Sequence, residues 1–114
     1  MEIETDEYRI NYDAQTTTIH CQGSLRLSGM EEYLPIVQLF DKVAELDRPT
    51  IIFDLRKLLF LNSSGINVLS KFVIKIRQKK NIHMVVQGSQ QIPWQEKSLK
   101  NLQRLMPALK LEWD

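Results

Sequence analysis

Cysteine is nearly absent from this sequence, and its scarcity excludes two kinds of protein. With Cys21 as its single cysteine, the chain can form neither an internal disulfide framework nor a cysteine-rich zinc site. The two histidines, His20 and His83, are not spaced from each other or from Cys21 as metal ligands are. We therefore expect no metal and no cofactor. A reducing, cytoplasmic setting fits a chain without disulfides.

The sequence also lacks an excess of charge and any long apolar run. Its 15 basic and 14 acidic side chains give a net charge of +1, whereas nucleic-acid-binding domains usually carry a clear basic excess. No apolar run approaches the ~20 residues that span a bilayer. Residues 1–7 are acidic, lack the layout of a signal peptide and are a candidate flexible N-terminus. We expect neither nucleic-acid binding nor a membrane span.

The sequence does contain enough apolar residues for one folded core. The 114 residues match the size of one domain, and 43% of them are hydrophobic, which is ordinary globular usage. No internal repeat, linker or low-complexity tract divides the chain. We predict a single domain over residues 1–114.

The N-terminal half predicts a hairpin followed by a helix. Residues 8–12 and 16–22 alternate apolar and polar side chains at the period of a strand. Helical spacing follows over residues 28–46, where Ser28 and Glu31 form a capping-box pattern. Because proline clashes deep inside a helix, we expect the main helix to begin near residue 34 with Pro35 in its first turn.

The C-terminal half predicts alternating strands and helices. Residues 50–55 are apolar on both faces, as in a central parallel strand covered on two sides. A short connection follows, and residues 64–80 then show the clearest helical spacing. Residues 82–87 predict a strand and residues 94–106 a short helix, while residues 108–113 fit a last edge strand or a fraying end.

This order of elements predicts a layered α/β domain with an N-terminal hairpin and a mixed, mostly parallel sheet packed against helices. Right-handed crossovers would place the β–α loops, including residues 62–65, at one edge of the sheet. An Asn-Ser-Ser-Gly corner there opens the long helix. A helix N-terminus has unpaired N–H groups and a partial positive charge, so it suits a phosphate or a carboxylate. A serine at this position is a candidate phosphate acceptor, which indicates a switch rather than a catalyst.

The chain resembles a STAS domain, the fold of bacterial anti-sigma-factor antagonists and related regulatory modules. The likeness runs from about Tyr8 to the C-terminus. Gly23-Ser24-Leu25 lies where the family has a glycine after its second strand, and Asp54-Leu55 lies where the family has a strand-ending acid. Asn62-Ser63-Ser64-Gly65 resembles the family signature Asp-Ser-Ser-Gly. Its spacing between an apolar strand and a helix makes the match more specific than a bare Ser-Ser-Gly.

The resemblance implies a non-enzymatic partner switch in signal transduction and transcription regulation. In family members that switch, a serine protein kinase of the histidine-kinase-like fold, often itself the anti-sigma factor, phosphorylates the first serine of the signature. A serine phosphatase reverses the change. The matching residue here is Ser63. The unphosphorylated form would bind the partner, and the phosphorylated form would release it.

One departure from the family signature leaves three options open. Asn62 replaces the family aspartate; it caps a helix about as well but carries no charge to pair with a kinase. The partner differs from the usual kinase, phosphorylation is less efficient, or the domain is an unphosphorylated scaffold within a larger regulatory or transport assembly. A plainer interpretation of Ser63 and Ser64 is that they only cap the helix.

A partner would dock on the tip of the long helix and on its exposed face. Ile74 is the sharpest feature of that face, because it is an apolar residue among polar neighbours, although single exposed apolar residues are common. The predicted partner-binding residues are Asn62, Ser63, Ser64, Gly65, Asn67, Lys71 and Ile74.

A serine-nucleophile enzyme is the main catalytic rival. Ser63 would then need a histidine base held by an acid, and the only candidates are His20 and His83, both on predicted strands. The segment also lacks the flanking glycines of a Gly-x-Ser-x-Gly elbow. We therefore predict no catalytic residues.

Overall fold

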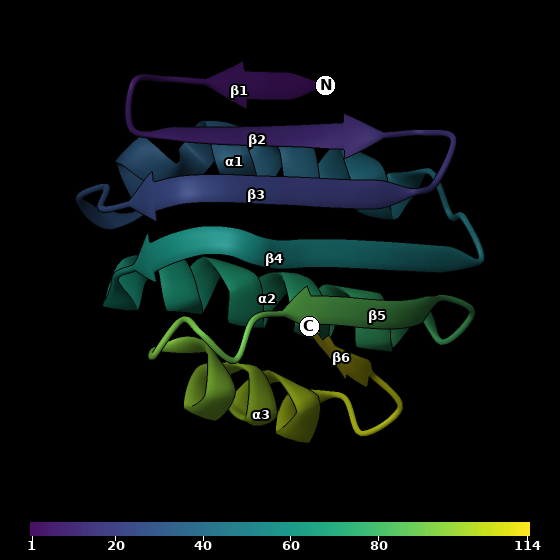
Figure 1. Cartoon of the computed structure of the whole chain (residues 1–114). Coiled ribbons are helices and arrows are strands. Elements are labelled where there is room, and N and C mark those ends of the chain that lie inside the picture. Colours follow the sequence, from purple (N-terminus) through teal and green to yellow (C-terminus); the bar gives the residue numbers. More distant parts are fainter.

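The computed structural model describes residues 1–114 as six strands and three helices in a single α/β domain (Figure 1). Strands β1 to β3 pair antiparallel, and β3 to β6 pair parallel. None of the three helices is long and apolar enough to cross a bilayer. In chain order the elements are β1 (Glu2–Glu4), β2 (Tyr8–Asp13), β3 (Thr18–Leu25), α1 (Gly29–Glu45), β4 (Thr50–Leu61), α2 (Ser63–Lys79), β5 (His83–Gly88), α3 (Gln95–Leu105) and β6 (Lys110–Trp113).

The strand order in the sheet is the order of the strands in the chain. Successive right-handed crossovers in one direction place all their helices on the same face, and Figure 1 shows α1 and α2 behind the sheet. The expectation that residues 50–55 are covered on both faces is therefore wrong. The apolar row Tyr12, Ile19, Phe53, Val86 and Leu111 points to the helices, and the polar row Glu2, Asn11, His20, Asp54, Gln87 and Glu112 lies on the opposite face.

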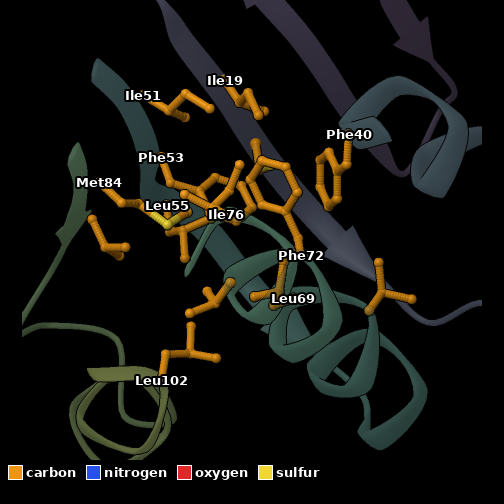
Figure 2. Close-up of a cluster of buried hydrophobic side chains, with 14 of the residues drawn as sticks. Ile19, Phe40, Ile51, Phe53, Leu55, Leu69, Phe72, Ile76, Met84 and Leu102 are labelled. Carbon is orange, nitrogen blue, oxygen red and sulfur yellow. The ribbon is translucent and has the colours of Figure 1, made fainter. Parts of the chain in front are cut away.

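Three phenylalanine rings lie at the centre of the core between the sheet and the helices. Phe53 of β4 meets Phe40 of α1 and Phe72 of α2 nearly edge-on, at centroid distances of 5.3 and 5.6 Å. The rings of Phe40 and Phe72 are 5.0 Å apart (Figure 2). Edge-to-face aromatic packing adds specific geometry to the burial of apolar area, so this cluster fixes how α1 and α2 sit on β4.

Helix α1 departs from the sequence prediction at its start. It begins at Gly29, so Pro35 lies inside the helix. The sequence had predicted a start near residue 34, with Pro35 in the first turn. Ser28 is the N-cap residue, and its backbone N–H bonds to Glu32 Oε1 at 3.0 Å instead of to Glu31. Tertiary packing of Tyr33 and Ile36, both buried, holds the helix through the proline despite the lost backbone bond.

Strands β1 and β4 also differ from expectation. Residues 2–4 of the predicted flexible N-terminus pair with β2 as strand β1. Strand β4 continues through Asp54 to Leu61, although residues 56–61 were expected to be a connection and Asp54 to end the strand. Its second half pairs with β3 through two register shifts. Such irregularities break the period-two pattern, which is why the segment resembled an apolar loop.

Side chains from the start of α3 satisfy the second half of β4, where pairing with β5 has ended. Gln95 is fully buried and donates from Nε2 to the carbonyls of Leu55 and Leu58, at 2.6 and 3.1 Å. Trp94 donates its indole N–H to the Leu58 carbonyl at 3.1 Å. Buried carbonyls need such partners. These bonds allow β4 to extend to the corner at residues 62–65.

Candidate functional site

Asn62 builds the corner between β4 and α2. Its Oδ1 accepts the backbone N–H of Gly65 at 2.9 Å, which caps the helix, and the hydroxyl of Tyr33 at 2.7 Å. Its Nδ2 donates to the carbonyl of Leu27 at 2.8 Å. One amide therefore joins α2, α1 and the loop between β3 and α1. This network fixes the direction in which the first turn of α2 leaves the sheet.

Gly65 is required by close packing beneath the same corner. It is buried, and a methyl group added to it would collide with the side chain of Leu61 and lie 2.7 Å from the Tyr33 hydroxyl oxygen. Gly65 was predicted to contact a partner. It instead lies under the surface and allows α2 to approach β4 and α1.

Ser63 and Ser64 are not the capping residues. Asn62 supplies the cap, and neither serine side chain forms a hydrogen bond within the chain. Ser63 is exposed and Ser64 half-buried in the first turn. The N–H of Gly65 is bonded to Asn62 Oδ1 and that of Ile66 to the Asn62 carbonyl at 2.9 Å. The N–H groups of Ser63 and Ser64 stay unpaired at the positive end of the helix dipole, where an anion is stabilised.

The remaining predicted residues lie along the outward side of α2. Asn67 and Lys71 are exposed, one and two turns beyond Ser63, and Ile74 is half-buried a further turn along. At ~100° per residue these positions form one stripe with Ser63. We call Asn62, Ser63, Ser64, Asn67, Lys71 and Ile74 the docking surface.

Sequence patterns did not predict three further exposed residues near the corner between β4 and α2. Leu59 and Phe60, in the irregular end of β4, are 62% and 40% exposed. Arg26, just after β3, places its guanidinium 4.8 Å from the centre of the Phe60 ring and has no acidic partner. Two neighbouring exposed apolar side chains next to a cation are typical of a protein contact. The only sequence signal was the apolar run of residues 58–61, which the bulges turn partly outward.

The network also gives a structural reason for asparagine at position 62. The Leu27 carbonyl needs a donor, and an ionised aspartate has none to offer. Because the amide serves both as acceptor to Gly65 and Tyr33 and as donor to Leu27, its neutrality is part of the fold. Asn62 is half-buried and committed to internal bonds.

A second polar cluster lies on the open face of the sheet. Asp54, 9% exposed, accepts from His20 Nδ1 at 2.9 Å and from the backbone N–H, Nε and Nη2 of Arg56 at 3.1, 2.9 and 3.1 Å. Burial favours the protonated carboxyl, but the hydrogen bonds from Arg56 and His20 together hold the pKa of Asp54 below its ordinary value. Since an ionised carboxylate only accepts, His20 carries its proton on Nδ1.

The His20–Asp54 pair is not placed to activate Ser63. His20 pairs across the sheet with Asp54, whereas the strand residue before Asn62, Leu61, pairs with Leu25. His20 and Leu25 are five residues apart on β3, or ~16 Å at ~3.3 Å per residue. His83 lies at the start of β5, opposite Thr50 at the other end of β4. No histidine is within the hydrogen-bonding reach that a serine nucleophile requires.

Comparisons with known proteins identify the fold. No family model and no curated protein matches the sequence. A chain in the crystal structure of the diguanylate cyclase SiaD in complex with its activator SiaC, from Pseudomonas aeruginosa, superposes with a TM-score of 0.74. The two share 14% identity over 100% of this chain and 99% of that one. A structure of SiaC from the same organism gives a TM-score of 0.70 at 12% identity, covering 99% of this chain and 93% of that chain.

A second kind of neighbour carries the match to the family that the sequence resembles. An anti-sigma factor antagonist from Mycobacterium paratuberculosis superposes with a TM-score of 0.62 at 18% identity, over 96% of this chain and 82% of that chain. At such identities the likeness concerns the fold. The chain has the STAS fold, as its sequence resemblance predicted.

Proposed function

We propose that this chain is a non-enzymatic regulatory protein that binds a protein partner through the docking surface and is switched by reversible phosphorylation of Ser63. Both kinds of structural neighbour support a role in acting on other proteins. One is an activator found in complex with a diguanylate cyclase, and the other is an anti-sigma factor antagonist. The family resemblance adds the kind of enzyme that modifies Ser63.

The observation that carries the proposal is the state of Ser63. Its side chain is exposed, forms no internal hydrogen bond and sits beside two unpaired N–H groups at the tip of α2. A kinase can reach such a hydroxyl without unfolding the domain. The helix N-terminus then stabilises the added phosphate from inside the protein.

The same phosphate opposes docking. It adds about −1.5 to −2 charge at neutral pH, at a residue that follows the exposed apolar side chains of Leu59 and Phe60 by only four and three positions. A partner that covers the tip of α2 must desolvate this phosphate. A loss of roughly 2 to 3 kcal/mol weakens binding ~30- to 150-fold.

The modifying enzymes follow from the family resemblance. A serine kinase of the histidine-kinase-like fold, acting also as an anti-sigma factor, is the proposed partner, and a serine phosphatase restores the binding form. The proposed setting is the bacterial cytoplasm, with transcription as the regulated process. The commitment of Asn62 to internal bonds favours one alternative, a STAS module that docks without being phosphorylated, because the corner offers a kinase no acidic side chain.

Mass spectrometry and two variants test the switch. Intact-mass analysis of protein purified from its native host should show a fraction heavier by one phosphate, and site mapping should place that phosphate on Ser63. Ser63→Ala should hold the copurifying partner constitutively, and Ser63→Asp should bind it at least ~10-fold more weakly, since a carboxylate reproduces part of the phosphate charge.

A matched control adds the same charge elsewhere. Asn101→Asp lies on exposed α3 and keeps an oxygen for its bond to Arg104, so its partner affinity should equal that of the unmodified protein. If Ser63→Ala and Ser63→Asp both bound the partner as the unmodified chain does, the switch would be wrong and the unphosphorylated module would be favoured.

A further inference from the structure

An apolar groove runs between α1 and α2 beside the docking surface. Its walls and floor are Met30, Val37 and Phe40 of α1 with Val68 and Phe72 of α2, and its volume is about 200 Å³. Met30 is 43% exposed, and the lining also includes the rings of Phe40 and Phe72, which Figure 2 shows packed side by side. A cavity of this size and lining accepts one or two large apolar side chains.

The groove and the switching serine lie on adjacent stripes of the same helix. Ser64, Val68, Phe72 and Lys75 follow one another at intervals of three or four residues, so they line one side of α2 from its tip downwards. The groove lining starts at Val68, one turn from Ser64, so a segment that lies in the groove and continues towards the tip of α2 approaches Ser63. Phosphorylation at that end and occupancy of the groove would concern the same bound segment.

The charges around the groove specify what that segment must carry. Helix α2 contains four basic residues and no acidic one. Lys75 is neutralised by Asp41 at 3.1 Å and Lys79 by Asp47 at 2.7 Å, while Arg77 donates to the carbonyl of Leu105 at 2.8 Å. Lys71 is left at the groove edge, exposed and without an ion pair. A carboxylate on the incoming segment is its natural counter-charge.

We propose that the α1–α2 groove binds an acidic amphipathic helix of the protein partner, with apolar side chains seated between Met30 and Phe72 and a carboxylate paired with Lys71. This inference rests on the proposed function, because it names the surface that the same partner uses. It extends the contact from the tip of α2 onto α1, which sequence analysis did not include. Helix-in-groove recognition of this kind uses anchors three and four residues apart.

Peptide mapping tests the groove directly. The probe is an 18-residue peptide with leucine anchors at intervals of three and four residues and glutamates beside them. Two matched peptides replace every glutamate with lysine or every leucine with serine. Each is titrated into the unmodified, ¹⁵N-labelled protein, and amide chemical shifts are followed. The acidic leucine peptide should shift amides of α1 and α2 around Val37 and Val68, and both matched peptides should bind at least ~10-fold more weakly.

Substitutions at two exposed positions distinguish binding in the groove from non-specific binding of the peptide. Lys71→Glu reverses the free charge, and Met30→Glu places an acid on the apolar rim while keeping a residue favoured in the first turn of a helix. Both should weaken the acidic peptide ~10-fold, with circular dichroism unchanged. Lys97→Glu, exposed on α3 and unpaired, should leave binding as it was.

Several results would overturn the inference. These are equal binding of the lysine or serine peptide, shifts on the open sheet face or the edge strands, and no binding at millimolar peptide. Concentration-dependent shifts at the groove without peptide would assign it to a second copy of this chain instead. Because the mapping uses unmodified protein, its failure leaves the Ser63 result intact, and an unmodified Ser63 leaves the mapping intact.

Discussion

Two polar clusters are attached to β4, and they differ in where their hydrogen bonds go. In the middle of the strand, Asp54 receives four bonds from His20 and Arg56, so the carboxylate is fully paired inside the domain. Beyond the end of the strand, Ser63 and Ser64 leave two hydroxyls and two N–H groups without partners in the chain. The side chain of Asp54 in the first cluster is almost completely buried, whereas that of Ser63 in the second is exposed.

The difference separates stability from recognition. A buried charge that is fully paired becomes costly to the fold when one partner is removed. Exposed groups with unused hydrogen bonds cost the fold nothing and remain available to another molecule. Asn62 belongs to the first kind, although it is next to Ser63, because its amide closes three internal bonds. The boundary between the two kinds therefore falls between residues 62 and 63.

The largest effect is expected at Asp54. Asp54→Ala removes the acceptor that His20 and Arg56 share. Because both of those side chains reach water, at 40% and 44% exposure, we expect the free energy of unfolding to fall by about 2 kcal/mol. Glu112→Ala, in the same polar row at the sheet edge, loses a 3.3 Å bond from Gln87 and should cost less than about 1 kcal/mol. Guanidinium denaturation of both variants measures the contrast. Equal losses at the two positions would show that the internal pairing of Asp54 is not what matters.

Acid should remove the contribution of the ionised Asp54 side chain to the free energy of unfolding, without any truncation of that side chain. The bonds from Arg56 and His20 hold the pKa of folded Asp54 below its ordinary value, and an unfolded aspartate titrates near 3.9. The stability it provides is therefore fully present above about pH 4 and is lost as pH falls through the lower folded pKa. The free energy of unfolding of Asp54→Asn should be lower than that of the unmodified protein by a constant amount from pH 7 to 5. This difference should shrink below pH 4. A difference that stays constant down to pH 3 would contradict this.

Position 62 tests which kind of cluster its side chain belongs to. Asn62→Asp restores the family residue. It replaces the amide Nδ2, which donates to the Leu27 carbonyl at 2.8 Å, with a carboxylate oxygen that repels that carbonyl. The lost donor costs about 1 to 2 kcal/mol, and the helix dipole returns about 0.3 to 1. We expect a net loss of about 1 kcal/mol, or a melting temperature lower by roughly 4 °C.

The matched control is Asn67→Asp, an exposed position one turn along the same helix. It adds the same charge without removing an internal bond, so its stability should stay within about 0.5 kcal/mol of the unmodified protein. The deficit of Asn62→Asp should also shrink in acid, because a protonated carboxyl regains a donor for Leu27. A stabilised Asn62→Asp protein would show that the Leu27 bond is not the reason for asparagine.

Much of this arrangement follows from local sequence patterns, and the exceptions share a cause. The helices after β4 and β5, the hairpin and the exposed serine all follow from periodicity and from the Asn-Ser-Ser-Gly corner. The second half of β4 does not, because its bulges hide the strand period and its carbonyls are satisfied by Gln95, far along the chain. Local patterns carry no information on such distant partners.

The site shows the same limit. Ser63, Asn67 and Lys71 lie on one helix, so their shared face could be predicted from spacing alone. Tyr33 comes from α1 and Arg26 from the end of β3. These two residues lie near the corner only because the chain crosses over between β3 and β4, so spacing along α2 could not predict them. The sequence likewise placed a partner on Gly65, since a motif does not reveal that Leu61 and Tyr33 cover it.

The smallest effect on stability is expected at Ser63, where the effect on binding should be largest. Ser63→Asp adds a charge at the first position of α2 and should stabilise the domain by about 0.3 to 1 kcal/mol through the helix dipole. Ser63→Asn matches its shape without the charge, so the difference between the two variants isolates that electrostatic gain. In 1 M NaCl the difference should fall towards zero, since the Debye length is then about 3 Å. Thermal melts of both variants at low and high salt measure it. A Ser63→Asp protein that unfolds more easily than Ser63→Asn would mean that residue 63 contributes to the fold as Asn62 does, and the contrast between the paired and unpaired clusters would fail.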